Sequence, residues 1–294
     1  MKKRSLKFND KAKDFLKSMC FLSPSLLGVG VFFIIPFFVV VYYSVIDGVG
    51  SRNFVFLDNF VKLFQNSAFL TAAKNTLTFS FLAVPLAVIL SMALALMLEC
   101  RIPLKSQFRT FFLSPMMVPV ASVVLIWQVL FNYNGTVNEF IMLFGADKID
   151  WLQTDYAMLV VIILFLWKNL GYNMILFMAA LSNIPRELLE VADVEGASEW
   201  YKFFAIKLRY LSPTVLFVTI LSLINSFKVF REVYLLTGAY PYSSLYMLQH
   251  FMNNNFETIN YIRLSVGAIL IFLVIFALVL VMLLLTKRRG DYEL

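Results

Sequence analysis

The sequence predicts an all-α integral membrane protein with six transmembrane helices. Hydrophobic residues make up 61% of its 294 residues, charged residues make up only 15%, and the mean hydropathy is +0.80. A soluble domain of this length carries charges at about 25% of its positions. The apolar runs continue without alternation over about 20 residues, which is typical of spanning helices and excludes the alternating strands of a membrane β-barrel.

The predicted helices follow from six runs, each long and apolar enough to cross the hydrocarbon core. In chain order the runs are residues 19–46, 75–98, 110–131, 157–182, 211–236 and 264–286. The first run holds 28 residues without a charge, more than the core of a cleavable signal peptide. The outer loops are rich in Asn, Gly, aromatic and acidic residues, so they are predicted to be structured caps rather than separate domains.

The distribution of positive charge predicts the orientation. With the N-terminus inside, the inner segments hold 17 Lys and Arg residues and the outer loops hold five. Cytoplasmic loops are enriched in Lys and Arg, so this ratio places both termini in the cytoplasm. The net charge of +7 therefore arises from segments beside the membrane, where it favours the anionic inner leaflet and argues against nucleic-acid binding.

The chain is predicted to form one membrane domain, residues 19–286, between a basic cytoplasmic N-terminus (1–18) and a short cytoplasmic tail (287–294). No Gly-x-x-x-x-Gly-Lys phosphate-binding loop is present in the sequence. Cys20, Cys100 and the single histidine, His250, lack metal-ligand spacing, and His250 is expected at the surface of an outer loop. We therefore expect no catalytic site, no metal site and no cofactor in this chain.

One polar segment stands between the long apolar runs. Residues 184–198 read Ile-Pro-Arg-Glu-Leu-Leu-Glu-Val-Ala-Asp-Val-Glu-Gly-Ala-Ser. Pro185 suits the first turn of a helix, and Gly196 supplies the permissive backbone for a turn between two short helices. Charged residues gain nothing from lipid, so the segment is predicted to contact a soluble partner. An ordinary amphipathic cytoplasmic loop is the alternative.

This segment resembles the EAA loop of bacterial ABC importer permeases, whose pattern is roughly Glu-Ala-Ala, three residues, Gly. The similarity continues through Ile206-Lys207-Leu208 to Ser212-Pro213-Thr214, with mild departures at Val191, Glu195 and Arg209. In that family the loop docks into a cytoplasmic ATPase. The resemblance implies a coupling loop over residues 184–212, with ATPase contacts at Glu187, Glu190, Val191, Ala192, Asp193, Glu195, Gly196 and Ala197.

Further short matches follow in order along the chain. Residues 56–60, 75–77, 109–119, 127–132, 167–174 and 233–238 are similar to carbohydrate-importer permeases of the maltose type. The resemblance implies a type I ABC importer permease (MetI-like) fold with its core at residues 71–286. It also implies a second homologous permease subunit, two cytoplasmic ATPase subunits that bind the ATP, an extracytoplasmic solute-binding protein, a carbohydrate substrate and the bacterial inner membrane.

Polar residues inside the apolar runs mark a candidate substrate path. Such groups are unfavourable in lipid unless they face a cavity or a partner. The resemblance implies a pocket between the third, fourth and fifth spans, lined by Met116, Val120, Phe165, Lys168, Asn169, Tyr172, Ser222, Asn225 and Ser226. Rings that stack on sugar faces and amides that bond hydroxyls suit this role. The alternative is hydrogen bonding between helices.

Other functions remain as alternatives. An ion-coupled secondary carrier should show acidic residues within its spans, and only Glu232 qualifies. A membrane-embedded enzyme should show clustered His, Asp or Glu. Within the ABC class, a permease for glycerol phosphates is the second candidate. Lys228 and Arg231, three residues apart on a predicted helix, share one face and raise the hypothesis of an acidic sugar; the alternative is that they pair with acids of the partner chain or reach outward.

Overall fold

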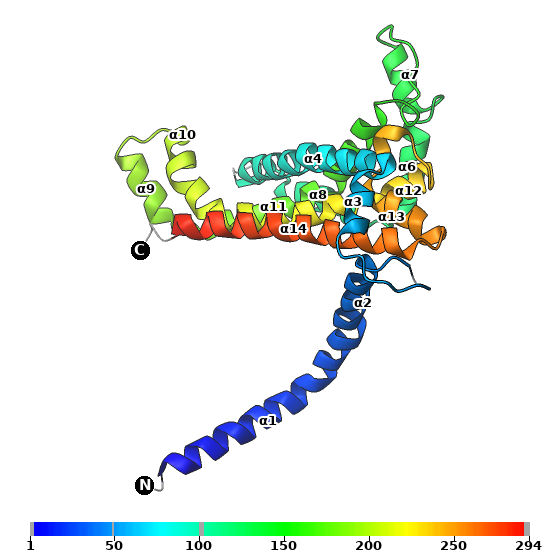
Figure 1. Cartoon of the computed structure of the whole chain (residues 1–294). Helices are drawn as coiled ribbons and strands as arrows, with labels where there is room; N and C mark the ends of the chain where they lie inside the picture. Colours follow the sequence, from blue (N-terminus) through cyan, green and yellow to red (C-terminus); the bar gives the residue numbers. More distant parts are fainter. Residues whose placement is uncertain (1–2, 49, 100–102, 291–294) are drawn as a thin grey trace.

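A computed structural model describes residues 3–48, 50–99 and 103–290 (Figure 1). The helices are α1 (Lys3–Val29), α2 (Ile35–Ser44), α3 (Asp58–Phe64), α4 (Ser67–Glu99), α5 (Lys105–Met117), α6 (Val120–Leu130), α7 (Thr136–Met142), α8 (Ala157–Ser182), α9 (Arg186–Val194), α10 (Glu199–Tyr201), α11 (Leu208–Phe227), α12 (Phe230–Thr237), α13 (Leu248–Glu257) and α14 (Tyr261–Gly290). Short π or 3-10 segments lie at η1 (Gly30–Ile34), η2 (Lys202–Lys207) and η3 (Ser243–Leu245). Cys100, Arg101 and residues 291–294 of the predicted tail lie outside the described residues.

The predicted multi-pass helical architecture is confirmed. In the described part of the chain, five helical runs are long and apolar enough to cross a membrane: Lys13–Ser44, Ser67–Glu99, Ala157–Ser182, Glu199–Thr237 and Tyr261–Leu284. The pair α5 and α6 makes a sixth span if its two halves are counted together. The predicted count of six spans is therefore reached only if α5 and α6 together cross the membrane once.

The third span is not the single helix that was predicted over residues 110–131. Its two halves, α5 and α6, meet at an angle of 100°. Val118 is extended, with ψ of 133°, and Pro119 follows with φ of −56° and ψ of 138°. A proline pushes the preceding residue out of the helical region, so the helix ends before it and a new one begins after it.

The fifth span is longer than predicted and is interrupted. Helical structure begins at Glu199 and continues to Thr237, where Gly238 ends it with φ of +82°. Lys228 and Val229 break the run between α11 and α12. Lys228 and Arg231 were expected to share a face of one continuous helix, and this is wrong because the helix is interrupted between them. Both side chains nevertheless line one cavity, which is described below.

Small residues let α4 and α8 pack closely. Ala83, Ala87, Ser91 and Ala95 recur every four residues along α4, and none of their surface is exposed. This spacing puts the four side chains on one face, and small side chains let membrane helices approach each other. Ala95 packs in one apolar cluster with Phe177 of α8, so the two helices form the centre of the bundle.

The bundle has two distinct ends (Figure 1). Helices α4, α8, α11 and α14 run side by side, and the α9–α10 hairpin extends beyond one end, next to the C-terminal end of α14. The short helices α7 and α13 lie at the other end. Helix α1 extends away from the bundle, while α2 contacts α14 through the rings of Phe37 and Phe272, whose centroids are 5.1 Å apart.

His250 is not the surface residue that was expected. Its side chain is completely buried in α13, against the ring of Phe230 at a centroid distance of 4.7 Å. The backbone N–H of Met247 donates to its Nδ1 at 3.4 Å. Burial lowers the pKa of His250 to about 4, because the apolar surroundings disfavour the charged ring. The residue is therefore a neutral, buried part of the end of the bundle formed by α13.

Candidate functional site

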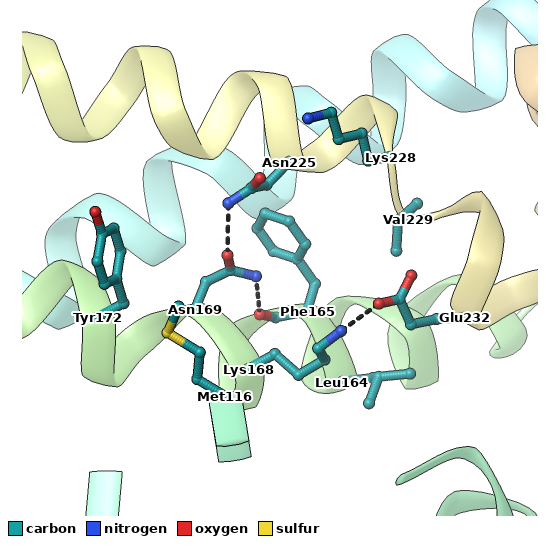
Figure 2. Close-up of a pocket in the computed structure, with 10 residues that line it drawn as sticks. All are labelled: Met116, Leu164, Phe165, Lys168, Asn169, Tyr172, Asn225, Lys228, Val229 and Glu232. Carbon is teal, nitrogen blue, oxygen red and sulfur yellow. Dashed lines mark hydrogen bonds and ion pairs between the residues drawn. The ribbon is translucent and has the colours of Figure 1, made fainter. Parts of the chain in front are cut away.

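A cavity of about 270 Å³ opens between α5, α8, α11 and α12. Figure 2 shows its lining, which consists of Met116, Leu164, Phe165, Lys168, Asn169, Tyr172, Asn225, Lys228, Val229 and Glu232. Its volume is close to the lower limit of about 300 Å³ for small-molecule pockets. Apolar and aromatic walls combined with a few polar groups are typical of binding sites for small organic solutes.

Helix α8 supplies one side of this cavity. Phe165, Lys168, Asn169 and Tyr172 are spaced three and four residues apart, so they project from one face of the helix. A polar face within an apolar span is unfavourable in lipid unless it meets a cavity or another helix. Here it meets both, since the same face also contacts α11 and α12.

Two amides connect α8 and α11 across the cavity. The Nδ2 group of Asn225 donates to Oδ1 of Asn169 at 3.0 Å, and Nδ2 of Asn169 donates to the backbone carbonyl of Phe165 at 2.8 Å (Figure 2). The Tyr172 hydroxyl has no hydrogen-bond partner among the described residues. The cavity therefore presents an oriented amide and a free hydroxyl beside an aromatic ring.

Lys168 and Glu232 form an ion pair between α8 and α12. Their side chains are only 21% and 11% exposed, so each charge would be poorly solvated without the other. Glu232 thus neutralises Lys168 and not its neighbour Arg231. The charge of Glu232 is paired within the bundle, which argues against an independent ion-coupling role for this residue.

A second cavity of about 370 Å³ adjoins the first. Lys168, Lys228 and Glu232 line both cavities, so these side chains lie at their junction. The rest of the second lining is Val120, Phe230, Arg231 and Gln249. No described residue forms an ion pair with Lys228 or Arg231.

The predicted substrate residues are distributed over three places. Six line the first cavity, namely Met116, Phe165, Lys168, Asn169, Tyr172 and Asn225, and Val120 lines the second. Ser222 and Ser226 lie outside both, and each is only 1% exposed. Ser222 accepts a hydrogen bond from Asn173 at 3.0 Å, and Ser226 pairs with Ser80 at 2.8 Å. These two serines join helices, as the alternative interpretation held.

Four residues of the first cavity were absent from the predicted lining: Lys228, which was considered only in the acidic-sugar hypothesis, and Leu164, Val229 and Glu232. Leu164 lies one helical turn before Lys168, so the helical period of the predicted face already indicated it. Val229 lies in the break after α11, and no pattern in the sequence marked it. Glu232 was noted only as an isolated acid, because its partner lies 64 residues earlier in the chain.

The predicted coupling loop forms a helical hairpin with a well-defined turn. Helix α9 ends at Val194, and Gly196 follows the C-cap residue Glu195 with φ of +75°. The N–H of Ala197 donates to the carbonyl of Ala192 at 2.9 Å, and that of Gly196 donates to Asp193 at 3.1 Å. This pair of bonds is a Schellman cap, which favours glycine at the left-handed position. Ser198 then caps α10 by accepting from the Tyr201 N–H at 3.2 Å.

Lys202 ties the two arms of the hairpin together. Its side chain is 9% exposed and forms ion pairs with Asp193 on α9 and with Glu199 on α10. Lys207 extends the connection to the bundle, since its ammonium lies 2.7 Å from the carboxylate of Glu99 at the end of α4. Nothing in the sequence indicated that Lys202 would have this structural role.

The outer face of the hairpin combines apolar and acidic groups. Val191 and Val194 are 60% and 87% exposed, while Ala192 faces inward and is buried. The remaining predicted coupling residues are exposed, except for the half-buried Ala197: Glu187, Glu190, Asp193, Glu195 and Gly196. An exposed apolar surface on a charged hairpin is typical of a site that meets another protein.

Comparison with known proteins agrees with this architecture. The family described as the binding-protein-dependent transport system inner membrane component matches residues 87–290. The chain belongs to this family. It is thus a membrane component of a transport system that depends on a binding protein, and the family is one of transporter subunits rather than enzymes. A secondary carrier acting alone is thereby set aside.

Individual relatives cover most of the chain. The lactose transport system permease protein LacF of Rhizobium radiobacter is 29% identical over 274 residues, which are 87% of this chain and 92% of LacF. The sn-glycerol-3-phosphate transport system permease protein UgpA of Escherichia coli is 33% identical over 210 residues, 70% of this chain and 71% of UgpA. These matches confirm the predicted ABC importer permease family.

A solved structure shows the same fold. The crystal structure titled as a bacterial alginate ABC transporter in complex with alginate pentasaccharide-bound periplasmic protein contains a chain that superimposes with a TM-score of 0.82. The two chains are 22% identical, over 96% of this chain and 97% of that chain. The predicted permease fold is confirmed by this similarity.

Proposed function

We propose that this chain forms half of the translocation path of an ATP-driven importer for sugars or oligosaccharides in the bacterial inner membrane. A second homologous permease forms the other half. Two cytoplasmic ATPases bind ATP and drive the cycle, and an extracytoplasmic solute-binding protein delivers the cargo. Both termini and the α9–α10 hairpin lie in the cytoplasm.

The cavity lined by α8 carries the proposal for the cargo. Tyr172 offers a ring and a free hydroxyl, and the Asn225–Asn169 pair offers oriented amides. Aromatic rings pack on the apolar faces of sugars, and amides bond their hydroxyls. The lactose transport relative supports a sugar, whereas the glycerol-3-phosphate transport relative supports the second candidate, a small phosphorylated polyol.

Substitutions in this cavity test the cargo. Tyr172→Ala and Asn225→Ala should each reduce sugar uptake by the intact importer about 5- to 100-fold, because a lost hydrogen bond or ring contact weakens binding by about 1–3 kcal/mol. Tyr210→Ala is the matched control, since Tyr210 is exposed on α11 and lines neither cavity. Unchanged uptake in both cavity variants would move the sugar path to the partner chain.

The exposed face of the α9–α10 hairpin supports the coupling proposal. Val194→Asp places a charge where an apolar contact with an ATPase is expected, and Glu190→Lys reverses a charge on the same hairpin. Both variants should insert in the membrane but lose co-purification with the ATPases and lose transport. Glu257→Lys reverses an exposed charge on α13, at the other end of the bundle, and should keep both. Normal ATPase binding in Val194→Asp and Glu190→Lys would exclude docking at this hairpin.

Cysteine labelling tests the orientation. Asp147→Cys and Tyr240→Cys, near α7 and α13, should react with an impermeant thiol reagent in intact cells. Glu195→Cys, in the hairpin, should be protected until the membrane is opened. The opposite pattern would reverse the proposed topology.

A further inference from the structure

We propose that the cargo of this path is an anionic saccharide, and that Lys228 and Arg231 select it by its negative charge. The proposal rests on the proposed function as a sugar permease and names the class of sugar. It starts from the charges that line the two adjoining cavities: three cations and a single carboxylate.

The carboxylate of Glu232 already has a positively charged partner. Glu232 is bound to Lys168, and this pair bridges α8 and α12 with both side chains mostly shielded from solvent. Such a pair is close to neutral as seen by a solute. Lys228 and Arg231 are left as two positive charges for which no described residue supplies a counter-charge. In Figure 2, Lys228 lies across the cavity from the Lys168–Glu232 pair, near Asn225.

The break in the fifth span places both cations at the cavities. Lys228 follows the last residue of α11, with φ of −89° and ψ of 0°, and Arg231 is in the first turn of α12. Helix α11 would otherwise continue past this level. The interruption therefore presents Lys228 at the junction of the two cavities and Arg231 in the second cavity.

The surroundings strengthen their effect. Val120, Phe230 and Val229 form apolar parts of the cavity walls, and low-dielectric walls focus the field of Lys228 and Arg231, which are themselves exposed at the open cavities. Gln249 and Asn225 add neutral hydrogen-bonding groups beside the two cations. Amides for hydroxyls together with ammonium and guanidinium groups for a carboxylate suit an acidic saccharide better than a neutral one.

The first experiment measures the electrostatic effect of Lys228 and Arg231 in the cavity, using the complete importer held in phosphatidylcholine nanodiscs. Met116→Cys serves as a reporter in the cavity, with Cys20→Ser and Cys100→Ser. Its labelling by an anionic and by a cationic methanethiosulfonate reagent is followed by mass spectrometry. Lys228→Gln with Arg231→Gln should lower the anionic-to-cationic rate ratio about tenfold at low salt. Arg263→Gln, which removes an exposed cation at the start of α14 that lines neither cavity, should leave the ratio unchanged. An equal ratio in the double variant would overturn the proposal, because a partner-chain acid would then neutralise the cations.

Protection of the same reporter identifies the ligand. Trigalacturonate should slow labelling at concentrations about tenfold lower than its fully methyl-esterified form, and the double variant should abolish the difference. Equal protection by the ester, or no protection by the acid, would refute selection of an acidic saccharide. Protection by glycerol 3-phosphate alone would refute it too and would favour the phosphorylated-polyol candidate. Loss of protection only when phosphatidylglycerol is added would assign the two cations to a lipid headgroup. The uptake defect of Tyr172→Ala tests the sugar-permease function separately from all these outcomes.

Discussion

Gly171 is the position where the smallest change should do the most damage. It lies on α8 directly before Tyr172 and faces the backbone of α5. A Cβ atom at this position would lie 1.8 Å from the carbonyl oxygen of Phe112 and 2.4 Å from its carbonyl carbon. Gly171→Ala therefore adds one methyl group at the closest approach of two helices that line the candidate cavity.

The size of the effect follows from these distances. An ordinary carbon–oxygen contact is at least about 3.3 Å, so α5 and α8 must separate locally by about 1.5 Å. The obstructing atoms belong to the backbone, so no side-chain rotation relieves the clash. Overpacking typically destabilises by about 1–3 kcal/mol, and alanine returns about 1 kcal/mol as the better helix former. With both partners rigid we expect the upper end of the range, a net loss of about 2 kcal/mol.

The same shift should impair transport. Met116 follows Phe112 by one helical turn on α5, so separation of the helices moves Met116 away from Tyr172 and widens the cavity. We expect Gly171→Ala to lower the thermal midpoint of the detergent-solubilised complex and to reduce uptake. Gly267→Ala on α14 is the matched control, because its Cβ would meet only Met252 Cγ at an ordinary 3.8 Å. If the two variants prove equally stable and active, the close contact between α5 and α8 does not exist in the protein.

Three further predictions test other contacts. Glu232→Gln leaves the Lys168 ammonium without its partner and should destabilise by about 3–5 kcal/mol, whereas Glu232→Gln with Lys168→Met should recover most of this loss in the same thermal assay; equal losses would argue against the ion pair. Lys202→Met removes both ion pairs of the hairpin, so limited proteolysis should cleave near Asp193 faster than in the parent protein, and an unchanged cleavage rate would refute the clamp. His250 has a folded pKa of about 4, below the ordinary value of 6.5, so the unfolded chain binds a proton in this range and the folded chain does not. Stability should therefore fall by up to about 3 kcal/mol between pH 6.5 and pH 4, and His250→Phe should remove this dependence; an identical slope in the variant would place the histidine in solvent.

The helical spans were predictable because apolar length is a local property. Runs of about 20 apolar residues identify helices whatever their neighbours are. The break in the third span was missed, although Val118-Pro119 carries a backbone restriction from which it could have been predicted. The break at Lys228 and Val229 could not have been, because no proline or glycine marks it. The early start of the fifth span at Glu199 was missed for another reason: hydropathy identifies the apolar part of a helix but not its polar extension.

The candidate site was predictable only where its geometry is local. Phe165, Lys168, Asn169 and Tyr172 follow the helical period on α8, so one face could be expected. Ser222 and Ser226 looked equivalent to Asn225 in the sequence, yet the rotation of α11 sends both serines toward other helices. Which side of a uniformly apolar helix faces a cavity depends on packing against distant segments. The Lys168–Glu232 pair and the burial of His250 depend on the same long-range contacts.

A continuous helix connects the α9–α10 hairpin to the cavity. The π-helical segment η2 joins α11 without a loop, so the chain is helical from Lys202 to Phe227. From Lys207 to Asn225 this helix spans about 27 Å at 1.5 Å per residue. Lys207 also holds the end of α4 through Glu99, and α4 packs along α8. A displacement of the docked hairpin would thus reach the cavity by two routes, along α11 to Asn225 and through α4 to α8, which carries Asn169. π-Helical turns inside α-helices are frequent at functional sites, so η2 is where such a displacement would be divided between bending and rigid rotation. A rigid connection moves Asn225 relative to Asn169 and separates the amide pair, whereas a bending one leaves the pair intact. That single hydrogen bond therefore distinguishes how the proposed ATPase motion opens the path.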